Sequence, residues 1–272
     1  MASLSTSALI SENRVQQFNE EGYCVIDGLF TPEEIGEIEG FFEEFKSKGL
    51  KVYDGAAIED VDPTKHQLRA MHPHRYSRKA QDWLLHPAVA AVLEILLGKP
   101  ALAVQSMYYF KPPGAKGQGM HQDNFYLVSS PNTCIAAWTA IDSSNTDNGC
   151  LYVAPGSHRR NIFCPDKAKS ETWFEYGDTH INPFPRDLKP VPVRVPKGST
   201  MFFSGNLVHG SGPNRTQDRS RRTFIGHYID GASEQVAKFY HPVLAMDGSV
   251  ISNVRVYEGG GPCGDGWQGG VH

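Results

Sequence analysis

The sequence predicts a mainly β fold: a double-stranded β-helix, the jelly-roll or cupin-like barrel, with flanking N-terminal α-helices. From residue 101 onward, short apolar and aromatic stretches alternate with turn residues, and no long helical pattern lies among them. Before residue 100, apolar residues recur at helical spacing. The 272 residues are expected to form a single domain (1–272), with a helical part over about 1–100, a jelly-roll core over about 101–245 and a glycine-rich tail over 258–272.

Two helices and a strand are predicted at the start of the chain. Residues 11–20 are expected to form a short helix that leads into a strand over 22–26. The next helix should begin at Thr31, because Thr can cap it, Pro32 suits its first turn and Glu34 can bond back to the cap. Its apolar face is predicted to contain Ile35, Ile38, Phe41, Phe42 and Phe45.

An irregular stretch and a third helix complete the N-terminal part. Residues 51–78 are expected to form a loop or lid. This stretch contains His72 and His74, but no Cys or carboxylate accompanies them at ligand spacing, so a loop is favoured over a metal site. The third helix is predicted over 82–97, because Gly98-Lys99-Pro100 follows it directly.

The core begins with Ala101–Phe110, an aromatic-rich strand that ends at the turn Lys111-Pro112-Pro113-Gly114. Further strands are predicted at 134–141, 198–203, 207–211 and 222–229. Long loops on a rigid scaffold often determine specificity. The irregular stretches 51–78 and 159–190 and the tail 258–272 are therefore candidates for the walls of a substrate pocket.

The motif His121-Gln122-Asp123 indicates a metal site. Side chains on a strand alternate between its two faces, so His121 and Asp123 are predicted to point the same way. His209, from a distant strand, would complete a set of two His and one carboxylate, which holds non-haem Fe(II) and leaves coordination positions open. An Arg nearby could bind a carboxylate of a co-substrate through two parallel hydrogen bonds. Together these residues predict an oxygenase.

The region from about Gln105 to His241 resembles the phytanoyl-CoA dioxygenase family of Fe(II)/2-oxoglutarate oxygenases. The segment from Phe18 to Ile26 also fits this family, whereas the last fifteen residues match no pattern we can name. The resemblance rests on six motifs in the family's order: His121-Gln122-Asp123-Asn124-Phe125-Tyr126, Ala137-Trp138-Thr139-Ala140, Asn148-Gly149-Cys150-Leu151, Pro155-Gly156-Ser157-His158, His209-Gly210-Ser211-Gly212-Pro213-Asn214 and Arg221-Arg222. It implies Fe(II), 2-oxoglutarate and O2 as cofactors, with His121, Asp123 and His209 as the catalytic metal ligands.

The resemblance also implies an Arg that binds 2-oxoglutarate. In the family this Arg usually falls at the position that Ser220 occupies here, so the preceding loop carries one extra residue. Alignment from the following strand instead selects Arg221, with Arg219 and Arg222 as its rivals. Only one of the adjacent pair Arg221 and Arg222 can point inward.

Two further contacts to 2-oxoglutarate, Ser211 and Trp138, are carried over from the family, and Gln105 is a further candidate because it lies on a strand expected to face the site. As alternatives, Ser211 would be a turn hydroxyl and Trp138 a core aromatic. Two other His residues could be mistaken for ligands. His158 is expected to pack within a turn, and for His227 an ordinary core His is favoured over a residue of the pocket wall.

The implied reaction is hydroxylation of an unactivated C–H bond of a small-molecule metabolite, with formation of succinate and CO2. Asp123 favours hydroxylation, desaturation or ring closure over halogenation, because related halogenases carry a small residue at that position. A CoA thioester would favour a basic patch, but Arg75, Arg78 and Lys79 are scattered, so a free metabolite is favoured. The alternatives are a cupin-type metal isomerase or lyase that does not use 2-oxoglutarate, and a non-catalytic binding protein descended from an oxygenase.

Composition limits the partners. A net charge of −4 gives no reason to expect nucleic acid, and no apolar stretch reaches the roughly 18 residues of a membrane span. The five Cys residues are scattered without a Cys-x-x-Cys pair, and Cys24, Cys134 and Cys150 are expected to be buried. A cytoplasmic, reducing setting is the expectation. Nothing in the sequence sets an oligomeric state.

Overall fold

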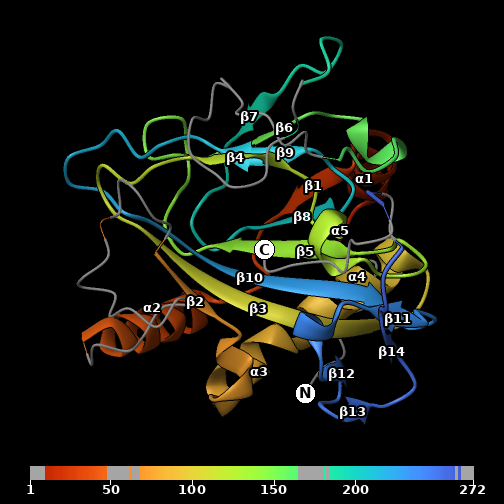
Figure 1. Ribbon diagram of the computed structural model, residues 1–272. Helices are drawn as coiled ribbons and strands as arrows, with labels where there is room; N and C mark the ends of the chain where they lie inside the picture. Colours follow the sequence, from red (N-terminus) through yellow and green to blue (C-terminus); the bar gives the residue numbers. More distant parts are fainter. Residues whose placement is uncertain are drawn as a thin grey trace.

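Two antiparallel sheets lie face to face and form the barrel (Figure 1). The computed structural model describes residues 10–47, 62, 68–164, 181, 184–260 and 263–264. The large sheet has the order β1 (Tyr23–Ile26), β8 (Thr200–Ser204), β5 (Ile135–Ala140), β10 (Arg221–Asp230), β3 (Ala101–Lys111), β12 (Val243–Ala245) and β13 (Val250–Ile251), and β2 (Arg69–Met71) also pairs with β3. The small sheet has the order β4 (Gln118–His121), β9 (His209–Ser211), β6 (Leu151–Val153) and β7 (Val191–Val193).

This architecture confirms the predicted mainly β, double-stranded β-helix fold with N-terminal helices. A separate parallel pair joins β11 (Gln235–Val236) to β14 (Arg255–Val256). The strand β3 is buried along its whole length, because one of its faces points into the barrel and the other lies under the helices.

The helices α1 (Glu12–Glu21) and α2 (Pro32–Ser47) lie where the sequence predicts them. The expected capping box forms at α2: the Thr31 N–H donates to Glu34 Oε2 at 2.7 Å, and the Glu34 N–H donates to Thr31 Oγ1 at 3.2 Å. The ring of Phe42 stacks on Tyr108 of β3 with 3.9 Å between centroids. The apolar face of α2 therefore packs on the outer face of the large sheet.

The predicted helix over 82–97 is in fact two helices, α3 (Arg78–Leu84) and α4 (Pro87–Leu97). Pro87 is the cause, because a proline disfavours helical backbone in the residue before it. His86 accordingly has an extended ψ of 128° and caps α4 through its ring, which accepts from the Ala88 N–H. By length and hydropathy Arg78–Leu97 could cross a membrane, a property shared by core helices of soluble proteins; here Val89, Val92 and Leu93 are buried in the core.

The irregular stretch 51–78 lies largely outside the described residues, but its end corrects the loop prediction. Residues Arg69–Met71 form β2, which pairs with Tyr109, Tyr108 and Met107 of β3. Both His72 and His74 are buried, and the His74 ring is hydrogen-bonded to the Ser106 hydroxyl at 2.6 Å. These two His residues therefore pack against the barrel wall.

The cysteines divide into two groups. Cys24, Cys134 and Cys150 are free and buried, as predicted. Cys164 and Cys263 form a disulfide across 99 residues, a pair that the scattered spacing did not indicate. Most of the stretch 159–190 and of the tail 258–272 lies outside the described residues. The disulfide links the start of the first stretch to the tail. The cytoplasmic setting remains a prediction.

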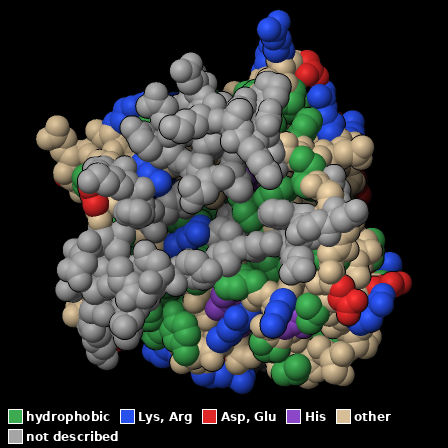
Figure 2. All heavy atoms as spheres, in the orientation of Figure 1, with side chains coloured by type: hydrophobic (Ala, Val, Ile, Leu, Met, Phe, Trp, Pro, Cys, Tyr) green, Lys and Arg blue, Asp and Glu red, His purple; other side chains and the backbone are tan. Residues whose placement is uncertain are grey.

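Figure 2 shows one face of the molecule with side chains coloured by type. On the lower part of this face, Lys, Arg and His side chains lie among hydrophobic ones. The described surface on this side is therefore mixed in character, in keeping with the scattered basic residues of the sequence.

Candidate active site

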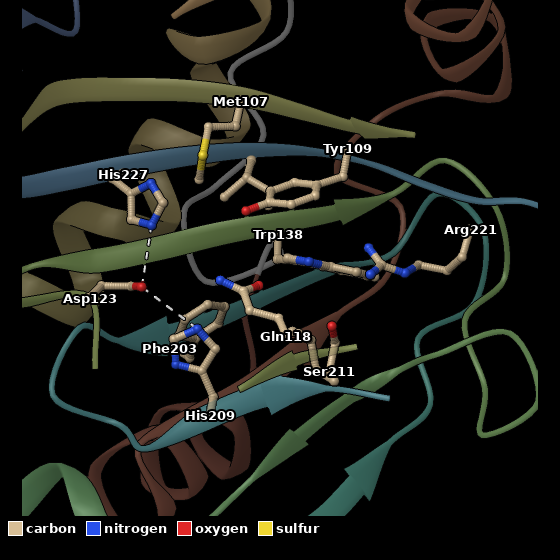
Figure 3. Close-up of a pocket in the computed structure, with 12 residues that line it drawn as sticks. Met107, Tyr109, Gln118, Asp123, Trp138, Phe203, His209, Ser211, Arg221 and His227 are labelled. Carbon is tan, nitrogen blue, oxygen red and sulfur yellow. Dashed lines mark hydrogen bonds and ion pairs between the residues drawn. The ribbon is translucent and has the colours of Figure 1, made fainter. Parts of the chain in front are cut away.

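A cavity lies between the two sheets (Figure 3). His209 and Ser211 reach it from the small sheet, and Trp138 and Arg221 reach it from the large sheet. Asp123 and His209 lie at one end of the view, and Arg221 approaches from the other. The cavity therefore has two ends of different chemistry.

His121 and His209 face each other because β4 and β9 pair with these two residues in register. The Nδ1 atom of His121 lies 2.7 Å from the Gly119 carbonyl, and that of His209 lies 3.0 Å from the Leu207 carbonyl. A carbonyl can only accept, so each Nδ1 carries the proton and each Nε2 presents a lone pair. This is the tautomer that a metal ligand requires.

Asp123 reaches the two His residues from a helical turn and not from the strand that the sequence had predicted. The strand β4 ends at His121, and Asp123 has helical backbone angles (φ −62°, ψ −37°) directly before α5 (Asn124–Leu127). The strand-alternation argument is therefore wrong for this residue, although it predicted the right neighbours. The helical turn brings Asp123 Oδ1 to 3.6 Å from Nε2 of both His121 and His209. The N–H of Asn124 donates to the Gly205 carbonyl at 2.9 Å and fixes the turn.

His227 holds the other oxygen of the same carboxylate. The Nε2 atom of His227 lies 3.2 Å from Asp123 Oδ2, and both side chains are buried. Figure 3 shows His227 and His209 approaching Asp123 from opposite sides. The sequence favoured an ordinary core His at 227, and this prediction is wrong, because His227 lies in the pocket wall. A hydrogen bond of this kind orients a ligand carboxylate and tunes the metal.

The donor set fits a divalent transition metal. One ligand atom from each of His121, Asp123 and His209 lies within 4.8 Å of the others, and all three residues are buried. Burial lowers the pKa of His209 to about 4, so its ring is neutral and its lone pair is available. Two imidazoles and one carboxylate on one face form the ligand set of non-haem Fe(II) oxygenases.

Arg221 makes the opposite end of the cavity an anion site. Its side chain is 3% exposed, and its guanidinium lies 5.2 Å from the centre of the Trp138 ring. Among the described residues no carboxylate pairs with it. Burial lowers its pKa to about 10, so it stays charged at neutral pH. A buried cation without a counter-ion favours binding of an anionic ligand.

The neighbours of Arg221 point elsewhere. Arg222 projects from the outer face of β10, where it binds Asp142 through two hydrogen bonds of 2.8 Å and also pairs with Glu39 and Glu43 of α2. Arg219 is exposed beside Asp147. Of the three candidates, the structure places Arg221 alone in the wall of the cavity.

Lys111 is a second basic side chain at this end, one that was not predicted from the sequence. It is the register partner of Arg221, and its Nζ donates to Ser211 Oγ at 2.9 Å. Burial and the charge of Arg221 hold its pKa well below the usual range. The signal in the sequence is a Lys that ends an otherwise apolar strand. Gly149 (φ +85°) makes room for it, because a Cβ there would lie 2.8 Å from Lys111 Cε.

Gln105 lies apart from the anion end. Its register partner is His227, at the metal end of β10, and it is not among the residues that line the cavity beside Arg221. His158 packs outside the cavity, with its Nε2 3.3 Å from the Asn19 carbonyl. Ser211 and Trp138, in contrast, line the cavity together with Arg221.

Comparison with known protein families matches residues 18–223 to the family described as phytanoyl-CoA dioxygenase (PhyH). Among curated relatives, the peroxisomal phytanoyl-CoA dioxygenase of Rattus norvegicus is 28% identical over 237 residues, which cover 83% of this chain and 70% of the rat protein.

Among solved structures, the fold is similar to that of SnoK, a non-heme alpha ketoglutarate dependent carbocyclase from nogalamycin biosynthesis (TM-score 0.69, 19% identity, 86% of this chain and 89% of that one). It is also similar to the epimerase SnoN in complex with Fe3+, alpha ketoglutarate and nogalamycin RO (TM-score 0.66, 19% identity, 82% and 84%). At these identities the likeness concerns the fold.

Proposed function

Because the chain belongs to the phytanoyl-CoA dioxygenase family, we propose that it is an Fe(II)/2-oxoglutarate-dependent dioxygenase that hydroxylates an unactivated C–H bond of a small-molecule metabolite. The observation that carries the proposal is the pairing of two sites in one cavity. A His-Asp-His set lies at one end, and a buried, uncompensated guanidinium lies at the other.

Each end matches one part of the co-substrate. His121, Asp123 and His209 would hold the iron, and Arg221 would pair with the C5 carboxylate of 2-oxoglutarate through its planar fork. Ser211 would add a hydrogen bond to that carboxylate, since Lys111 already donates to its hydroxyl oxygen and leaves its proton free to point into the cavity. Trp138 would lie along the carbon chain, beneath the guanidinium. Iron and 2-oxoglutarate, when bound, supply the O2-dependent oxidation, with succinate and CO2 as by-products.

The protein's own contribution is orientation and exclusion of water. His227 fixes one carboxylate oxygen of Asp123, so the other oxygen faces the two imidazoles. The ligands and Arg221 are buried, which strengthens every charge interaction in the cavity. The carboxylate of Asp123 would hold the metal at the position that halogenation would need for halide, which supports hydroxylation, desaturation or ring closure over halogenation.

Two rival functions lead to different results in one experiment. Anaerobic addition of Fe(II) and then 2-oxoglutarate should produce the weak visible charge-transfer band of the chelate, and O2 should then release succinate. An isomerase or lyase that does not use 2-oxoglutarate would bind metal without the band. A binding protein would give the band but no succinate across a metabolite screen.

The type of oxidation is read from the product. Hydroxylation adds one oxygen atom, desaturation or ring closure removes two hydrogens, and epimerisation leaves the mass unchanged. Mass spectrometry of a substrate found by substrate-stimulated succinate release therefore tests the hydroxylase proposal. A product without added oxygen would refute it while leaving the oxygenase class intact.

A further inference from the structure

Two buried polar side chains near the metal end of the barrel make no hydrogen bond. The amide nitrogen and oxygen of Gln105 both lack a partner, and the residue is 0% exposed. Both ring nitrogens of His72 also lack a partner, and that residue is 5% exposed. Buried polar groups are nearly always paired in native proteins. Unpaired buried groups near the metal end therefore point to a missing partner such as a ligand.

Gln105 faces the interior of the barrel. It is separated from Met107 and Tyr109 by even steps along β3, and both of those residues line the cavity. Because strand side chains alternate, Gln105 shares their face. Its register partner on β10 is His227, which contacts Asp123. The amide is therefore one strand away from the residue that holds the ligand carboxylate.

His72 lies across from Ser106, the residue that follows Gln105 on β3. It follows β2, and its N–H donates to the Ser106 carbonyl at 2.8 Å. Its backbone is left-handed (φ 50°, ψ 44°), a conformation that is uncommon for a residue other than glycine and often occurs at functional sites. Its ring packs against Phe239 with 4.6 Å between centroids and lies 6.4 Å from the ring of Tyr240, in the cluster that also contains Tyr126 next to His121. The imidazole thus lies on the side of the barrel where the metal ligands are.

The two side chains together recognise a neutral group. Gln offers two N–H donors and one acceptor oxygen, and a neutral imidazole offers one donor and one acceptor. Burial lowers the pKa of His72 to about 2, so the ring is uncharged at physiological pH. A carboxylate or phosphate is better served by the cation Arg221 at the far end of the cavity. A hydroxyl, carbonyl or amide matches the uncharged pair.

We propose that Gln105 and His72 form a subsite of the substrate pocket that hydrogen-bonds a neutral hydroxyl, carbonyl or amide group of the primary substrate. The inference rests on the proposed function, because it takes the metal end of the cavity as the place where the substrate is oxidised. It assigns Gln105 to the substrate rather than to 2-oxoglutarate. The substrate class is accordingly a metabolite with a neutral polar group near the oxidised carbon, rather than a bare hydrocarbon chain.

The test is a set of crystal structures of the anaerobic protein loaded with Fe(II) and 2-oxoglutarate, soaked separately with 2-propanol, acetone and acetate. The oxygen of 2-propanol or acetone should lie within hydrogen-bond distance of the Gln105 amide and the His72 ring, and acetate should be absent from this position. In Gln105→Met and in His72→Phe, which keep the volume but not the hydrogen bond, probe occupancy should fall about fivefold.

Ser144→Ala is the matched control, because the Ser144 hydroxyl is buried without a partner away from the cavity. It should leave probe occupancy unchanged. Each test variant removes an unsatisfied polar group, so neither should lower the melting temperature. If one of them fails to fold, the other tests the same subsite.

Three outcomes would overturn the subsite: the Gln105 amide turned onto 2-oxoglutarate, no polar probe at the position, or wild-type probe occupancy in both variants. The same maps and the visible band test the proposed function separately. Absence of the band and of 2-oxoglutarate density would sink the dioxygenase, whatever the probes show at Gln105 and His72.

Discussion

Replacement of Arg221 by Met should have opposite effects on the free protein and on its complex with 2-oxoglutarate. Burial lowers the pKa of Arg221 from 12.5 to about 10, which corresponds to about 3 kcal/mol of lost folding stability for the charged side chain. Because the folded-state pKa of this base is below its unfolded value, the penalty is complete at all pH values below about 10 and disappears only as the pH rises above it.

The favourable contact of Arg221 with the Trp138 ring offsets about 1 kcal/mol of that penalty. Arg221→Met should therefore stabilise the free protein by about 2 kcal/mol, which raises the melting temperature by roughly 4–8 °C for a chain of this size. Loss of the buried charge pair should weaken binding of 2-oxoglutarate by at least about 2 kcal/mol, roughly 30-fold or more.

The assay is a thermal melt with and without 2-oxoglutarate, together with an anaerobic titration of the charge-transfer band. Arg219→Met is the matched control, because Arg219 is exposed two residues away and should change neither quantity. A free Arg221→Met protein that melts several degrees below wild type, or that binds 2-oxoglutarate with wild-type affinity, would refute the reasoning.

Four further outcomes are expected. Asp123→Ala should abolish succinate formation and high-affinity metal binding, measured by metal titration, because it removes one of three ligands. His227→Leu should weaken metal affinity about 10- to 100-fold and His227→Gln should weaken it less, since only Gln can still donate to Asp123; equal affinities would contradict this role. Burial lowers the pKa values of His72 and His74 to about 2 and 3, so the folded protein keeps its full stability above pH 6.5 and loses stability as the pH falls below that value. The free energy of unfolding in urea should therefore be about 3 kcal/mol lower at pH 5.5 than at pH 7.5. The difference should be smaller in a His72→Phe, His74→Gln double variant. Reduction of the Cys164–Cys263 disulfide should lower stability by up to about 4 kcal/mol by chain entropy, and a reductant should have no such effect on Cys263→Ser.

The barrel was predictable because its strands carry strong local signals. Aromatic and β-branched runs bounded by Gly and Pro mark β3, β5, β8 and β10, and the capping box marks the start of α2. The break before Pro87 was missed because the helical apolar pattern continues across it. The strand β2 was missed because three residues are too short to show a period.

The site was predictable as far as motif spacing and strand alternation reach. Alternation separates Arg221 from Arg222, and the structure shows them on opposite faces. Asp123 shows the limit, because the argument assumed that β4 continues past His121. Lys111 and His227 enter the site through contacts with residues about 100 positions away. The sequence marks them only weakly, Lys111 as a Lys that ends an apolar strand and His227 by its even spacing from Arg221 along one strand.

The contacts of Arg222, which lie outside the cavity, help to keep Arg221 inside it. A slip of β10 by a single residue would turn Arg221 out to solvent and bring Arg222 inside. Such a slip would break the contacts of Arg222 with Asp142 and with two glutamates on neighbouring turns of α2. The helix α2 thus helps to fix the pairing register of β10, the strand that carries Arg221. Loss of Glu39 and Glu43 should consequently reduce the 2-oxoglutarate affinity of a cavity that neither residue touches.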